Sequence, residues 1–192
     1  MAEQQASSRE VVAVQAFLDE FSEDRIMRIC DGVLGIEGVA CSFPLGMIPH
    51  FTIGSWWVTT PELEEAKPVF TTRLTSLRAV EVSVDLLERE KDEPASYSYF
   101  LRPEVTDSLR RLHAGIHEKL GYPYEPYRKI DLPGSWWPHL TLFTIPKEKK
   151  SMAEEQISRL KEITTVRIAR LGLVTFYPTI ETVTEVRLRN AE

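Results

Sequence analysis

The chain of 192 residues contains no long hydrophobic run and few cysteines, and each of these absences excludes a class of protein. No window approaches the roughly 18 uninterrupted apolar residues that a membrane-spanning helix requires. The N-terminal segment, residues 1–9, is polar and lacks the apolar run of a signal peptide, so we expect a short disordered lead-in. The sequence therefore predicts a cytoplasmic protein that does not associate with membranes.

Two cysteines occur, Cys30 and Cys41, which are too few for the disulfide framework of a small secreted protein. We expect both to be reduced thiols, buried as small apolar groups, as is usual in the cytoplasm. A single disulfide between them stays open. Because no Gly- or Ser-rich linker divides the chain, we expect residues 1–192 to form one domain.

Positive charge is also scarce. The chain has 23 Lys and Arg against 29 Asp and Glu, which leaves a formal net charge of −6. Non-specific binding of nucleic acid comes mainly from the neutralisation of phosphates by Lys and Arg. We therefore do not expect binding to long nucleic-acid tracts. A small phosphate ligand, or an RNA end held in one locally basic cleft, remains compatible with this charge.

Hydrophobic periodicity predicts strands that alternate with helices, as in an α+β protein. The composition, 43% hydrophobic, is sufficient for a real core. Each half has a strand, a helix, a strand that begins with Pro-His and a second helix, which indicates an internal duplication. Strands are expected at 10–18, 50–57, 79–87, 96–101, 139–145, 166–176 and 182–189, and helices at 22–34, 61–77, 103–120 and 147–163.

Two short motifs share the pattern Pro-His-apolar-Thr-apolar. They are Pro49–Ile53 and Pro138–Leu142, one in each half, and they contain two of the four histidines. Side chains alternate between the two faces of a strand, so the histidine and threonine of each motif should share one face. The apolar residues should face the core. Two such faces could meet across a groove if the halves are related by a pseudo-twofold axis.

Paired histidines suit displacement at phosphorus, because the pKa of histidine lies near neutrality. We expect His50 and His139 to be catalytic, one neutral as the base and the other protonated as the acid. The hydroxyls of Thr52 and Thr141 are expected to bind the non-bridging phosphate oxygens. This chemistry needs neither a metal nor a cofactor. Which histidine is the acid stays open.

The paired His-x-Thr-apolar motifs, each preceded by Pro, resemble those of the two-histidine (2H) phosphoesterase superfamily, in particular its bacterial 2′-5′ RNA ligase and cyclic phosphodiesterase branch. The resemblance covers nearly the whole chain. It implies an α+β fold of two pseudo-symmetric lobes, each a mainly antiparallel sheet with helices outside, around a central cleft. It also implies catalytic roles for His50 and His139 and phosphate binding by Thr52 and Thr141. The sequence departs from the commoner pattern at Phe143–Ile145, where many relatives have a small or basic residue.

Continued alternation would place Gly54 and Trp56 on the face of His50, and Phe143 on the face of His139. Gly54 would leave room beside the phosphate, and Trp56 and Phe143 are candidates to stack on a nucleobase. Aromatic residues at strand ends also close cores, so both interpretations stay open. In the loop before the second motif, Arg128 or Lys129 could offset phosphate charge, although both could equally be ordinary surface residues.

His113 and His117 share one side of a predicted helix. Without a recognisable third ligand, we interpret them as surface or helix-packing residues rather than a metal site.

Three functions remain open. The first is a metal-independent phosphoesterase or transesterase that acts, as a monomer, on 2′,3′-cyclic phosphates or 2′-5′ phosphodiesters in RNA ends or small cyclic nucleotides. The second is a non-catalytic module that binds nucleotides or RNA ends in the same cleft. The third is a structural or interaction protein whose motifs match by accident. Retention of both histidines and both threonines favours the first; the direction of reaction, hydrolysis or ligation, is not decided by the sequence.

Overall fold

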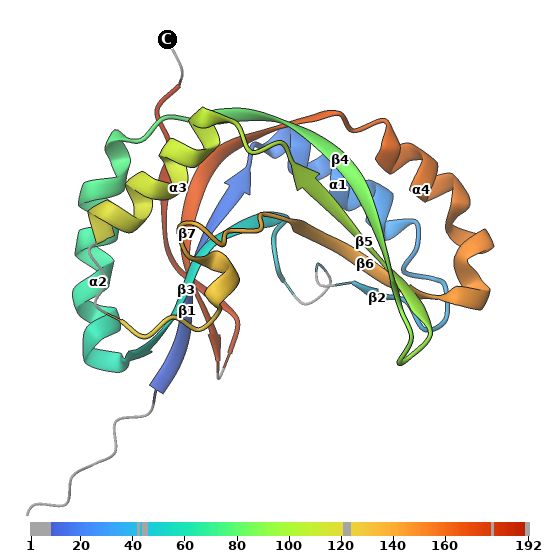
Figure 1. The fold of residues 1–192 in the computed structure, drawn as a ribbon, viewed down its shortest axis with the longest axis horizontal. Helices are drawn as coiled ribbons and strands as arrows, with labels where there is room; N and C mark the ends of the chain where they lie inside the picture. The colour runs from blue at the N-terminus through green and yellow to red at the C-terminus, as the bar shows by residue number, and fades with distance from the viewer. Residues whose placement is uncertain (1–8, 42, 44–45, 121–123, 178, 191–192) are drawn as a thin grey trace, which may run out of the picture.

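The computed structural model describes residues 9–41, 43, 46–120, 124–177 and 179–190 (Figure 1). Of the predicted lead-in, Arg9 already belongs to the first strand, and residues 1–8 lie outside the described residues. The order of elements confirms the predicted alternation of strands and helices. In chain order they are β1 (Arg9–Leu18), α1 (Glu20–Asp31), β2 (Ala40–Cys41), β3 (His50–Thr59), α2 (Thr60–Arg73), η2 (Leu74–Ser76), β4 (Val80–Lys91), β5 (Ser96–Pro103), α3 (Asp107–Leu120), η3 (Lys129–Asp131), β6 (Leu140–Pro146), η4 (Lys147–Ala153), α4 (Glu154–Lys161), β7 (Thr165–Tyr177) and β8 (Glu181–Arg187).

Within the described residues, eight strands form one antiparallel sheet in the order β2-β6-β5-β4-β7-β1-β3, with β8 beside β7. Residues Val80–Ser83 of β4 pair with β7, whereas Val84–Lys91 pair with β5. The long strand β4 thus joins two half-sheets, one containing β7, β1 and β3 and the other β5 and β6. The first motif strand, β3, pairs with β1 in one half-sheet, and the second motif strand, β6, pairs with β5 in the other. This arrangement confirms the predicted α+β fold of two pseudo-symmetric lobes.

Two pairs of helices cover the sheet. Helix α2 packs against α3 and against β1, β3 and β8, while α4 packs against α1 and β4. Figure 1 shows the two pairs on opposite sides of the view. The apolar stripe predicted for α3 is buried at Leu109, Leu112 and Ile116. In the described part of the chain, no helix combines the length and apolar character needed to span a membrane.

Some predicted element boundaries were wrong. Helix α1 begins at Glu20 because Asp19 is its N-cap, where the carboxylate accepts a hydrogen bond from the Ser22 N–H at 2.9 Å. Strand β4 continues through its charged end to Lys91, which pairs with Ser96 of β5. The helix predicted at 147–163 begins as the 3₁₀ helix η4 and becomes α-helical only in α4.

Each motif strand contains a β-bulge directly after its threonine. The extra residue is Ile53 in β3 and Leu142 in β6, and both are fully buried in a hydrophobic cluster that includes residues of both halves. A bulge places two residues of one strand opposite one residue of its neighbour, so the alternation of faces is reversed beyond it. The two bulges therefore decide which later residues face the motif histidines.

Candidate active site

The structure brings the two motif histidines together from the two halves. His50 is the first residue of β3, and His139 immediately precedes β6. Both are half-buried. Cα atoms of β3 and β6 approach within 8 Å, and charge on His139 acts on His50. The two histidines are therefore close enough for the charge on His139 to lower the pKa of His50.

Both rings are oriented by the same type of hydrogen bond. Nδ1 of His50 lies 2.7 Å from the carbonyl oxygen of Ile48, and Nδ1 of His139 lies 3.0 Å from that of Trp137. A carbonyl oxygen can only accept, so each Nδ1 carries a hydrogen. In the neutral ring, Nε2 then holds the lone pair. Both histidines are thus prepared to exchange a proton at Nε2.

A phenylalanine supports each ring from the neighbouring strand. The ring centroid of Phe17, which pairs with His50, lies 6.5 Å from that of His50 in an edge-on arrangement. Phe100 meets His139 edge-on at 5.4 Å. These contacts repeat the pseudo-symmetry of the sheet at the level of single side chains.

The pKa values of both histidines are low. Burial lowers the pKa of His50 to about 4, with a further contribution from the positive charges of His139 and Arg128, while the hydrogen bond to Ile48 opposes the shift. Burial and Arg128 also lower the pKa of His139. Both imidazoles therefore favour the neutral form more than an exposed histidine does. A bound phosphate anion would raise both pKa values, because it stabilises the charged form.

Thr52 and Thr141 keep their hydroxyls available for a ligand. Thr52 is half-buried and Thr141 is exposed, and neither hydroxyl bonds to another of the described residues. The next hydroxyl on each strand, beyond the bulge, is used internally. Ser55 Oγ donates to Asp131 Oδ2 at 2.5 Å, and Thr144 Oγ1 lies 2.9 Å from Ser98 Oγ.

Of the two interpretations left open for Trp56 and Phe143, nucleobase stacking or closure of the core, the structure supports closure of the core. Trp56 is 3% exposed and Phe143 is 1% exposed, and both belong to the core. The bulges at Ile53 and Leu142 reverse the alternation, so each aromatic side chain points to the face opposite the histidine of its strand. Neither is placed to stack on a nucleobase.

Gly54 accommodates Trp56 rather than a phosphate. A Cβ atom at Gly54 would lie 2.3 Å from Cη2 of Trp56, well inside van der Waals contact. The absence of a side chain at Gly54 is thus required by core packing. The prediction that Gly54 leaves room for the ligand is corrected accordingly.

The sequence Gly-Ser-Trp-Trp occurs twice, at residues 54–57 and 134–137, and the second copy connects the loop before β6 to the first motif. Trp136 Nε1 donates to the carbonyl oxygen of Thr52 at 3.0 Å, and its ring stacks on His113 with centroids 4.1 Å apart. Trp137 provides the carbonyl that orients His139, and its ring lies 4.3 Å from that histidine. This segment therefore contacts residues of both motifs.

Residues 124–128 run along β3. The Trp57 N–H donates to Glu125 O at 2.9 Å, and the Tyr127 N–H donates to Ser55 O at 2.8 Å. These bonds place Arg128 where its charge acts on both motif histidines. Of the two basic residues that the sequence suggested, the structure places Arg128 beside the motifs. Arg128 also lines a small cavity together with Thr52.

Sequence reasoning missed Gln15. Its side-chain nitrogen lies 2.9 Å from Nε2 of His50, and the residue is 3% exposed. The available signal was a single polar residue inside the apolar run Val11–Leu18. Its partner could not be identified, because the contact depends on the pairing of β1 with β3.

Of the two roles left open for His113 and His117, surface or helix packing, the structure shows packing. His113 Nε2 donates to Asp131 O at 3.0 Å, and His117 Nε2 donates to Ile53 O at 3.2 Å, so both rings tie α3 to the site. Among the described residues, no group of three His, Cys, Asp or Glu side chains is arranged to hold a metal ion. Cys30 is buried and Cys41 is half-buried, and no disulfide joins them.

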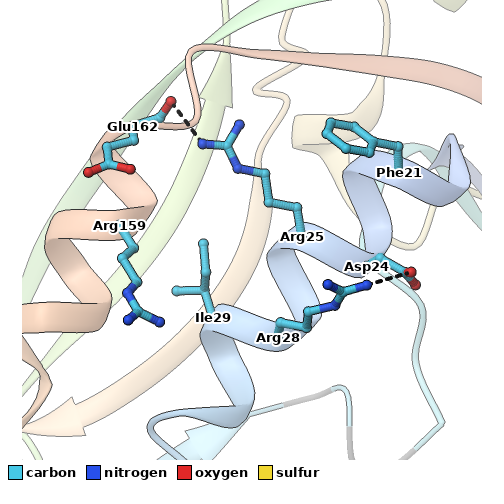
Figure 2. A pocket seen from close by; sticks show the side chains of 7 residues that line it. All are labelled: Phe21, Asp24, Arg25, Arg28, Ile29, Arg159 and Glu162. Atoms are coloured by element: carbon cyan, nitrogen blue, oxygen red, sulfur yellow. Dashed lines mark hydrogen bonds and ion pairs between the residues drawn. The ribbon is translucent and has the colours of Figure 1, made fainter.

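A hollow of about 380 Å³ lies elsewhere, between α1 and α4 (Figure 2). No motif residue lines it, and its three guanidinium groups already bind oxygen atoms of this chain. Arg25 donates to Glu162 O at 3.3 Å, and Arg28 and Arg159 form ion pairs within their own helices. The motif strands are therefore the better candidate for a functional site.

Comparison with known proteins identifies the class to which this fold and site belong. The family model of the 2′-5′ RNA ligase superfamily matches residues 44–177. The chain therefore belongs to the 2′-5′ RNA ligase superfamily, which confirms the resemblance seen in the paired motifs. A comparison with curated protein sequences finds no relative of this chain.

Particular solved structures share the fold. The Thermus thermophilus protein TT0787 is 15% identical, with a TM-score of 0.56, covering 95% of this chain and 100% of that one. E. coli LigT in complex with NADP⁺ is 9% identical, with a TM-score of 0.55 and coverages of 95% and 99%. Usb1 of Kluyveromyces marxianus is 11% identical, with a TM-score of 0.51 and coverages of 95% and 98%.

Proposed function

We propose that this protein is a phosphoesterase or transesterase that acts on 2′,3′-cyclic phosphates or 2′-5′ phosphodiesters by acid–base catalysis between His50 and His139. The observation that supports it most is the matched orientation of the two rings. Each is anchored through Nδ1 to a carbonyl, and each comes from a different half of the sheet. Two proton carriers on opposite sides of one phosphorus suit an in-line displacement.

The proposed hydrolysis of a 2′,3′-cyclic phosphate uses one water molecule. The neutral histidine takes a proton from the water as its oxygen bonds to phosphorus. The bond from phosphorus to one ribose oxygen breaks, and the protonated histidine gives its proton to that oxygen. The first histidine then holds the proton that the second has lost, and exchange with solvent restores the starting state. No metal takes part in these steps.

Three further groups support the proposal. The Thr52 and Thr141 hydroxyls would donate to the non-bridging oxygens, and Arg128 would attract the phosphate from the neighbouring loop. The ligand class is consistent with the structural relative E. coli LigT, whose structures include complexes with 3′-AMP, NADP⁺ and ATP. We infer the same class, a small nucleotide or an RNA end that carries a phosphate, for this chain.

The test is incubation with a panel of 2′,3′-cyclic nucleotides and 2′-5′-linked dinucleotides, with and without EDTA. We expect turnover that survives the chelator. His50→Ala and His139→Ala should each lower kcat by about 10²–10⁴-fold, with little loss of stability because both rings are half-buried. The control His117→Gln, which keeps a donor for the carbonyl of Ile53, should remain active.

The pH dependence provides a second check. Because kcat/KM reports the pKa values of the free enzyme, and both histidines titrate below the ordinary value of about 6.5, we expect a bell-shaped profile with its maximum below that pH. Near wild-type rates in either alanine variant would contradict the proposal. Nucleotide binding without turnover would instead identify a binding module.

A further inference from the structure

The two motif histidines differ in one hydrogen bond. Nε2 of His50 lies 2.9 Å from the side-chain nitrogen of Gln15. Within the described part of the chain, Nε2 of His139 has no such partner, and the ring makes its one hydrogen bond through Nδ1. This contact makes the two halves of the site chemically unequal.

Gln15 is buried, with 3% of its surface exposed, between cross-strand neighbours Thr52 on β3 and Gly172 on β7. Among the described residues, its amide makes one hydrogen bond, the bond to His50. Burial of an amide that uses little of its hydrogen-bonding capacity costs free energy that an apolar side chain would avoid. The presence of Gln15 is therefore better explained by its effect on His50 than by stability of the sheet.

The contact distinguishes the two protonation states of the ring. Because Nδ1 of His50 donates to a carbonyl, the neutral ring is an acceptor at Nε2, and the Gln15 amide N–H donates to it. A proton on Nε2 would point at that same donor. The arrangement therefore favours the neutral ring and fixes the direction of its lone pair.

We propose that Gln15 is a positioning residue that keeps His50 neutral and oriented as the base, which leaves His139 to protonate the departing oxygen. This assignment rests on the proposed function and resolves which histidine takes which role. In the hydrolysis, the attacking water takes the place of the amide as the hydrogen-bond partner of Nε2.

Other charges near His50 stay in place when Gln15 is replaced, so variants of Gln15 isolate its contribution to the pKa of His50. Among the described residues, the titratable and charged groups that act on His50 or contact the adjacent Phe17 ring come from several elements. They are His139 before β6, Arg128 before η3, and Arg170 on β7 with its ion-pair partners Glu23 on α1 and Glu185 on β8.

The first experiment titrates the histidine rings by NMR in the wild-type protein, Gln15→Glu, Gln15→Leu and a matched control, Gln156→Leu. Gln156 lies on α4 and also has a buried side-chain oxygen. In Gln15→Glu the carboxylate stabilises the imidazolium, so we expect the pKa of His50 to rise by about 1 to 3 while that of His139 changes little. Gln15→Leu should give a smaller rise, because the neutral ring loses its donor. Unchanged titration of His50 in both variants would overturn the proposal.

The second experiment assigns the base of the hydrolytic direction with thymidine 3′-(4-nitrophenyl phosphate), which has no 2′-hydroxyl, so that water is the nucleophile. The base takes a proton from the water, the water oxygen bonds to phosphorus, and the bond to 4-nitrophenolate breaks. This leaving group departs as an anion, and the proton on the base returns to solvent. His139→Ala should therefore stay within about tenfold of the wild-type rate, whereas His50→Ala should lose about 10²-fold or more. The reverse pattern would overturn the assignment.

Kinetics of the Gln15 variants separate positioning from packing. Gln15→Leu should fold at least as stably as the wild type, yet lower kcat about tenfold with KM within about twofold. An unchanged kcat would indicate a structural role and contradict the proposal. If the wild-type protein turns over no phosphoester, the proposed function fails and the base assignment with it. The NMR titration would still decide whether Gln15 controls the protonation of His50.

Discussion

The motif threonines, Thr52 and Thr141, occupy equivalent places but differ in their surroundings. Thr52 is half-buried in β3, with its carbonyl bonded to the indole of Trp136, while Thr141 is exposed at the start of β6. In both, the hydroxyl lies one residue before the bulge and on the face of the histidine. We therefore expect both to contribute, with Thr52 the more rigidly held.

Replacement of each hydroxyl by a methyl group tests this role at the scale of single residues. Thr52→Val and Thr141→Val keep the β-branched shape but remove a donor to the phosphate, so each should lower kcat on the order of 10²-fold. Steady-state kinetics with a 2′,3′-cyclic nucleotide measure the effect. Thr144→Val is the control, since its hydroxyl already bonds to Ser98; an equal loss in that variant would argue against a role specific to the motif.

At the scale of elements, the bulge in β3 depends on how closely neighbouring side chains pack. Gly54 follows the extra residue Ile53, and the indole of Trp56 occupies the space where a side chain of Gly54 would lie. The bulge, the glycine and the buried tryptophan form one packing unit directly beyond the first motif. We expect a substitution that displaces Trp56 or the bulge to shift the backbone of β3 and, with it, the position of Thr52.

Gly54→Ala tests this unit. Its Cβ atom would lie 2.3 Å from Trp56, so overpacking should lower the free energy of unfolding by about 1–3 kcal/mol and reduce activity as β3 shifts. Urea denaturation followed by tryptophan fluorescence measures the stability. Gly35→Ala is the control, because nothing lies within 4 Å of its Cβ position, and it should change stability by less than about 0.5 kcal/mol. Equal stability of the two variants would show that Trp56 can move without cost.

At the scale of the whole molecule, burial affects the ionisation of all four histidines. Burial lowers the pKa of His50 and of His113 to about 4, and it also lowers the pKa values of His117 and His139. Burial raises the pKa of Glu23 to about 7 in spite of its pairing with Arg170. Because the pKa of each histidine is lowered, the fold loses stability as the pH falls through the range in which the unfolded histidines take up protons. Because the pKa of Glu23 is raised, its contribution to stability instead grows as the pH falls below about 7.

His113 offers a test outside the motifs. Its folded pKa of about 4 lies below the unfolded value of 6.5, so its stabilisation is complete above pH 6.5 and is lost as the pH falls toward 4. His113→Leu removes this term, and the decline in unfolding free energy from pH 7 to about pH 4 should be smaller than in the wild type by on the order of 1–3 kcal/mol. Urea unfolding at several pH values measures it. Glu23 contributes equally to both proteins, so the difference between their unfolding free energies isolates His113. If the unfolding free energies of the two proteins declined in parallel with falling pH, the folded state would not lower the pKa of His113.

The sequence by itself was sufficient for the α+β fold, the order of elements and the family. Periodicity within each segment reports which face is buried, and two motifs of one shared pattern, one in each half, identified His50, Thr52, His139 and Thr141 as candidates. These signals come from residues close together in the chain, so they can be read without knowing which strands are neighbours.

Only the tertiary structure decided what lies around those four residues. The bulges at Ile53 and Leu142 turn Trp56 and Phe143 into the core, and the pairing of β1 with β3 brings Gln15 to His50. Strand register, burial and the resulting pKa values depend on contacts between residues far apart in the chain. Alternation along a single strand carries no information about them.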